Sequence, residues 1–224
     1  MQLAGRTSWR FGENDGGNLD LALFARDAAG LEVPPAPDIP PPLSVAIGHR
    51  LAPAPAAAAA QWVTWWRGLI QFQAGEAVPT RRLGAGDDLD AWLEALRERH
   101  MAAFDPPEFV SLASMPELRR TASAAFAAYG RSLMPREPPD RTPPGAFDYH
   151  VVRAAAEGAI AEFGVDPGEI DGTVQVLNVR GAWSHLAAPG YALCSAQVAA
   201  EPAAAAALLR NVFASRLGRD GSRA

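Results

Sequence analysis

The spacing of apolar residues predicts three amphipathic helices in the middle of the chain. Between residues 56 and 72 the apolar positions recur every three or four residues, and polar residues occupy the opposite side. This apolar stripe consists of Trp62, Trp65, Trp66, Leu69 and Ile70. Similar stripes predict helices over residues 87–104 and 114–130, and the second of these begins with a capping box of Ser114 and Glu117.

The first thirty residues allow two interpretations. Leu19, Leu21 and Leu23 alternate as in a strand, whereas Asn18 as N-cap and Gly30 as the residue after the last turn are typical of a helix. We favour the helix, because no turn residue interrupts the run before Gly30. The preceding stretch, residues 11–20, is rich in Gly, Asn and acidic residues. It reads as a turn with a helix cap, because its spacing does not fit a calcium loop.

The pattern changes in the last third of the chain, where strands join the helices. Residues 148–165 predict a helix capped by Asp148, and residues 202–217 predict a second helix. Between them, residues 173–180 and 191–195 are rich in apolar residues and predict two strands, joined by a connection that contains Trp183. Two strands leave an open sheet edge, for which residues 43–49 are our candidate third strand.

These elements predict an α+β protein with a mainly helical N-terminal two-thirds and a helix–strand–strand–helix unit at the C-terminus. Two proline-rich stretches separate its parts, and both contain apolar residues that suit packing against one compact body. The expected parts are an N-terminal segment with a helix (1–32), a proline-rich segment (33–55), a helical block (56–130), a proline-rich connection (131–147), the α/β unit (148–217) and a frayed tail (218–224).

Composition excludes several kinds of chemistry. The chain has 224 residues and no lysine, so Schiff-base and P-loop lysines are ruled out. The net charge of −5 and the lack of a basic stripe argue against nucleic-acid binding. Arginine in place of lysine and the many alanines and prolines suggest a GC-rich bacterial genome. A single cysteine and the lack of any long apolar run lead us to expect a cytoplasmic protein that does not insert into a membrane.

Candidate chemistry is sparse, and no cofactor or metal is expected. The histidines lie far apart, and no glycine motif has the spacing of a dinucleotide site. Cys194 and His185 are weak candidates for a nucleophile and its base, although an unpaired cysteine in a strand is more often a core residue. Trp183, between glycines in a loop beside His185, is a candidate aromatic anchor for a partner or ligand, although a tryptophan there more often folds back to cap the sheet and leaves the histidine in solvent.

The tryptophan stripe has two possible roles. Three tryptophans carry on the order of 600 Å² of mostly apolar surface, more than a soluble monomer usually exposes in one patch. Trp62, Trp65 and Trp66 are therefore expected in the core or, alternatively, under a partner.

We expect a non-catalytic interaction protein that binds another protein or itself, such as an adaptor, an immunity-type partner or an assembly component. The alternatives are a small enzyme or ligand-binding domain that uses Cys194 and His185 beside Trp183, and a homo-oligomeric structural subunit.

Overall fold

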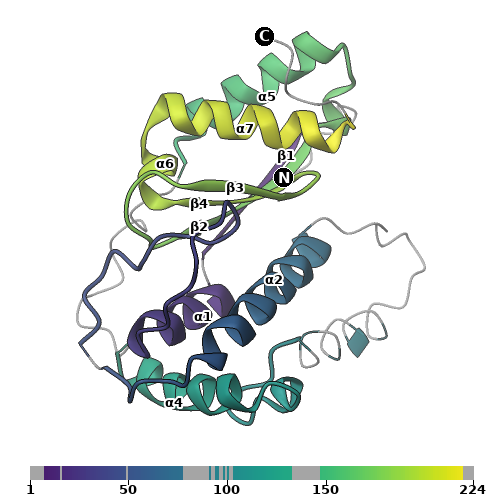
Figure 1. Cartoon of the computed structure of the whole chain (residues 1–224). Coiled ribbons are helices and arrows are strands. Elements are labelled where there is room, and N and C mark those ends of the chain that lie inside the picture. The colour runs from purple at the N-terminus through teal and green to yellow at the C-terminus, as the bar shows by residue number, and fades with distance from the viewer. Residues whose placement is uncertain are drawn as a thin grey trace. The chain divides into compact units, whose positions relative to one another are not determined.

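The chain folds into two compact units, which Figure 1 shows as ribbons. The sheet unit comprises residues 1–16 and 140–224, and the helical unit comprises residues 17–139. The computed structural model describes residues 8–15, 17–48, 50–77, 91, 94–95, 98, 100, 103–132 and 147–218. The predicted helix over residues 87–104 and the connection 131–147 lie largely outside the described residues.

The architecture is α+β, as the sequence predicts, with a four-stranded mixed sheet among the described residues. The strands are β1 (Arg10–Asp15), β2 (Asp171–Leu177), β3 (Ser184–Ala188) and β4 (Tyr191–Ser195), in the order β1-β2-β4-β3. Strands β1, β2 and β4 run parallel to one another, whereas β3 is antiparallel to β4.

Two strands differ from our expectations. The sheet does not contain the expected third strand from residues 43–49; its place beside β2 is taken by β1, from a stretch that we predicted as a turn. The sequence of β1, RFGEND, has low intrinsic strand propensity, so pairing with β2 and ring contact between Phe11 and Phe147 override it. Strand β3 lies inside the stretch that we predicted as a connection.

Helices cover one face of the sheet (Figure 1). They are α5 (Tyr149–Phe163), α6 (Ala196–Ala200) and α7 (Pro202–Arg216), with a short 3₁₀ helix, η2 (Pro167–Glu169), before β2. Asp148 caps α5 as predicted, and its side chain accepts a hydrogen bond from the His150 amide. Val174 and Cys194 from the sheet and Leu209 and Val212 from α7 share one buried cluster, so this side of the sheet carries the core of the unit.

The helical unit is built on α1 (Gly17–Ala28), α2 (Ala57–Ala77) and α4 (Pro116–Ser132), with η1 (Val110–Leu112) leading into α4. The helix that we favoured over a strand is therefore present as α1. It ends as predicted: Gly30 adopts φ 62° and the Leu31 amide donates to the Arg26 carbonyl, a Schellman arrangement. Within the described part of the chain, none of the helices is long and apolar enough to cross a membrane.

Candidate functional site

The three tryptophans of the predicted stripe belong to the core of the helical unit. Trp62 and Trp66 are fully buried and Trp65 is 4% exposed. The rings of Trp62 and Trp66 stack with centroids 5.4 Å apart, and Trp65 stacks on Phe104. This burial agrees with the core alternative, and it removes the stripe from the surfaces that could receive a partner or ligand.

Cys194 and His185 do not form a catalytic pair in this structure. In the antiparallel register His185 lies opposite Leu193, and Ser184 lies opposite Cys194. Opposite residues share a face of the sheet and successive residues alternate, so the two side chains project to opposite faces. Burial and the neighbouring Glu13 carboxylate raise the pKa of the Cys194 thiol to about 12. The thiol is therefore protonated near neutrality, and His185, on the other face of the sheet, is not placed to act as its base.

Trp183 and His185, by contrast, do lie together. Their rings are 6.3 Å apart and stacked, with an angle of 23° between their planes, and both side chains are half-buried. The backbone of Trp183 is anchored to β4, because its carbonyl accepts from the Ser195 amide and its amide donates to Ser195 Oγ. The aromatic pair thus stands at the start of β3, held in place by the neighbouring strand.

Strand β3 is the terminal strand on this side of the sheet. Because Trp183 O accepts from Ser195 N, the alternation of antiparallel bonds directs the backbone groups of His185 toward β4. The N–H and C=O groups of Ser184 and Leu186 then point out of the sheet. Among the described residues these outward groups have no hydrogen-bond partner. The Leu186 side chain is 43% exposed.

The two edges of the sheet differ in chemistry. Strand β1 carries charged side chains, including Glu13 and Arg10, which is paired with Asp171 at 2.8 Å. Strand β3 reads Ser-His-Leu-Ala-Ala and carries no permanently charged residue. Natural edge strands are usually protected by charge, proline or a bulge. A register irregularity lies between Leu186 and Ala188, so the regularly paired part of β3 is Ser184–Leu186.

Two further features of the described residues have some properties of a site. A pocket of about 350 Å³ in the helical unit lies between residues 51–55 and α4, and its Arg120 guanidinium is already paired with Glu117. In the sheet unit the buried Tyr191 hydroxyl donates to Gln175 Oε1 at 2.5 Å, and burial raises the pKa of Tyr191. The described part of the chain contains no group of three or more side chains that could hold a metal ion.

No protein-family model matches this chain, and neither curated protein sequences nor solved structures show significant similarity to it. Function must therefore be argued from the geometry. The β3 edge, defined as residues 183–186, combines an anchored aromatic pair, outward backbone groups and an exposed leucine. Sequence reasoning found its aromatic residues but missed the edge, because the strand is short and lies in a stretch bracketed by glycines.

Proposed function

We propose that the chain is a non-catalytic protein-binding protein, and that it pairs the β3 edge with an extended segment of its partner. The observation that carries the proposal is the uncharged terminal strand with outward backbone groups at Ser184 and Leu186. Strand addition uses such groups for affinity and neighbouring side chains for specificity.

The side chains beside this edge suit a partner strand. Leu186 offers an exposed apolar contact, and the stacked rings of Trp183 and His185 offer a rigid aromatic surface on the other face. Tyr, Trp and Phe are enriched in protein interfaces because they bury much area at low entropic cost. Because β3 carries no permanently charged side chain, a partner strand can pair with it without removing water from an ion on β3.

We also propose that the chain acts in the cytoplasm of a bacterium. This location is supported by the single cysteine, which is buried in the sheet unit, and the bacterial origin by the absence of lysine, which points to a GC-rich genome. The net charge of −5 supports a protein partner over nucleic acid. Cell fractionation with an antibody against the chain tests the location.

Site-directed photo-crosslinking tests the interaction. A photoreactive residue at the exposed position Ser184 should capture one protein in cells, and Leu186→Lys in the same chain should abolish the product by charging the edge. The matched control is Val110→Lys, which charges a 59%-exposed apolar residue of the helical unit and should leave the product intact. A product of twice the chain mass would identify a second copy as the partner.

The proposal is overturned if the probe at Ser184 captures nothing beyond what the same probe captures at Val110. Persistence of the product in Leu186→Lys, with circular dichroism like that of the parent, would also overturn it.

A further inference from the structure

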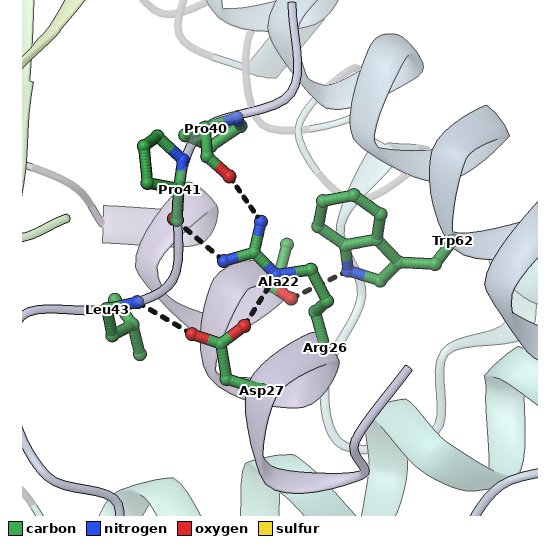
Figure 2. A network of polar contacts seen from close by, with 7 residues as sticks. All are labelled: Ala22, Arg26, Asp27, Pro40, Pro41, Leu43 and Trp62. Atoms are coloured by element: carbon green, nitrogen blue, oxygen red, sulfur yellow. Dashed lines mark hydrogen bonds and ion pairs between the residues drawn. The ribbon is translucent and has the colours of Figure 1, made fainter. Parts of the chain in front are cut away.

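Part of the first proline-rich stretch is bound to the helical unit as a peptide ligand would be. The segment Asp38–Leu43, with the sequence DIPPPL, contains neither a helix nor a strand of the sheet, and we call it the proline segment. Its residues come from the same unit as helices α1 and α2, which hold it. Figure 2 shows the α1 side chains that face it.

Side chains of α1 and α2 donate hydrogen bonds to backbone carbonyls of the proline segment. Arg26 of α1 donates from Nη1 to the Pro40 carbonyl at 2.6 Å and from Nη2 to the Pro41 carbonyl at 2.9 Å (Figure 2). Trp66 Nε1 of α2 donates to the Asp38 carbonyl at 2.8 Å. These three bonds use backbone carbonyls, and the prolines restrict the backbone to conformations that can present those carbonyls.

The carboxylate of Asp27 contacts both the proline segment and Arg26. Its Oδ2 accepts from the Leu43 amide at 2.7 Å, and its Oδ1 accepts from Arg26 Nε at 2.5 Å (Figure 2). The carboxylate therefore orients the guanidinium of Arg26 and also binds the backbone amide of Leu43. Arg26 also lies over the Trp62 ring, with the guanidinium carbon 5.3 Å from the centroid. Arg26 is only 5% exposed with the proline segment in place, and Asp27 and Trp62 orient its guanidinium.

The chemistry of this surface is that of proline recognition. Extended proline-rich peptides bind proteins through aromatic surfaces and through donors that reach their carbonyl groups, and their restricted backbone lowers the entropic cost. Ile39 and Leu43, the apolar residues on either side of Pro40–Pro42, are nearly buried. The bound sequence is therefore an apolar residue, three prolines and a second apolar residue.

We propose that the surface around Arg26, Asp27 and Trp66 is a recognition site for extended proline-rich peptides, which the chain's own proline segment occupies in cis. A tethered segment has an effective concentration on the order of millimolar or more, so it outcompetes a free peptide of similar affinity. A proline-rich segment of another protein binds only when the chain's own segment leaves. This site is independent of the β3 edge, because it uses other residues in the other unit.

A peptide added in trans tests the proposal. The variant carries Ile39→Gly, Pro40→Ser, Pro41→Gly and Pro42→Ser together. These substitutions should release the proline segment from the site, and they leave the sequences of α1 and α2 unchanged. The probe is a synthetic peptide of residues 36–45, APDIPPPLSV, blocked at both ends. We expect one-to-one binding by calorimetry with Kd below about 1 mM, and binding at least roughly tenfold weaker to the intact chain. A peptide with alanine in place of its three central prolines is the matched control.

The arginine separates recognition from nonspecific adhesion. Adding Arg26→Lys to the emptied chain should weaken peptide binding by roughly tenfold or more, because lysine cannot donate to two carbonyls from a fixed fork. The proposal is overturned if the emptied chain shows parental helical circular dichroism but does not bind the peptide, or binds the control peptide equally well.

A milder variant covers the case in which the emptied chain unfolds. Asp38→Asn removes the charge that pairs with Arg67 at 2.6 Å and keeps the Asp38 carbonyl that Trp66 binds. In this variant an excess of the peptide should accelerate hydrogen exchange of the Leu43 amide, because the displaced segment loses its bond to Asp27. Unchanged exchange at Leu43 under saturating peptide would overturn the proposal.

Discussion

Replacing Gly172 by alanine tests how closely α7 packs on the sheet. A Cβ atom at position 172 of β2 would lie 2.6 Å from Cγ1 of Val212 and 3.2 Å from two ring carbons of Phe213. Both side chains are fully buried, and a β-branched valine in a helix has one strongly preferred rotamer. The added methyl group must therefore displace α7 or force an unfavourable rotamer.

Overpacking of this kind costs about 1–3 kcal/mol of unfolding free energy. A second glycine of the same unit supplies a control of opposite sign. Gly158 is an exposed residue inside α5, and a Cβ there meets no atom within 4 Å. Gly158→Ala should stabilise the unit by about 0.5–1 kcal/mol through helix propensity. The two variants make the same chemical change, so only their surroundings can separate them.

The single cysteine provides the assay. Cys194 is buried in the cluster that contains Val212, so a thiol reagent labels it only when the sheet unit opens. Labelling rates across urea concentrations give the opening free energy of each variant. Gly172→Ala should label faster than the parent and Gly158→Ala more slowly. Equal or slower labelling of Gly172→Ala would refute the packing argument. If Gly172→Ala labels faster and the double variant with Val212→Ala labels more slowly than Gly172→Ala alone, the steric clash lies between residues 172 and 212.

Three further predictions concern buried polar groups. Burial raises the pKa of Cys194 to about 12, so the stability that the protonated thiol contributes is complete below its usual pKa near 9 and is lost as pH rises toward 12. Urea titrations at pH 8 and pH 10.5 should show a lower free energy of unfolding at the higher pH. In Cys194→Ala the difference between the two pH values should be smaller. Tyr191→Phe removes the donor to Gln175 and should lower the unfolding free energy by about 1 kcal/mol, measured by the same labelling assay; an unchanged value would show that the bond contributes nothing net. Trp62→Phe removes the bond from Nε1 to the Ala22 carbonyl and part of a stacked pair, and should cost about 1–3 kcal/mol in a urea titration followed by helical circular dichroism.

Local patterns predicted most of the helices because each carries its signals within one or two turns. The apolar stripe lies within α2, and the Asp148 cap and Gly30 lie just outside the ends of α5 and α1. The two missed strands depend on distant partners instead. β1 pairs with β2, which lies about 160 residues further along the chain, and its own residues do not favour a strand. No local pattern contains that pairing.

The candidate sites were likewise predictable only where they depend on residues close together in the sequence. Sequence reasoning placed Trp183 beside His185 and gave the tryptophan stripe a core role as its first alternative, and both agree with the structure. It favoured a core role for Cys194, which is buried, and offered the pair with His185 only as a weak candidate. The register that places these two side chains on opposite faces depends on pairing that a local pattern does not contain. Arg26 was missed entirely. A buried arginine is unusual, and its carbonyl partners lie fourteen and fifteen residues away in the chain.

The two proposed sites use different physics, and this makes them separable in one protein. The β3 edge offers unpaired backbone groups and an exposed leucine, so a single lysine at Leu186 should disable it. The proline site offers donors that are already satisfied by the chain itself, so it is limited by competition in cis. Leu186→Lys should therefore abolish the photo-crosslink and leave peptide binding unchanged, and Arg26→Lys should do the reverse. If either substitution affected both readouts while the fold stayed intact, the sites could not be independent, and the assignment of separate partners to the two units would fail.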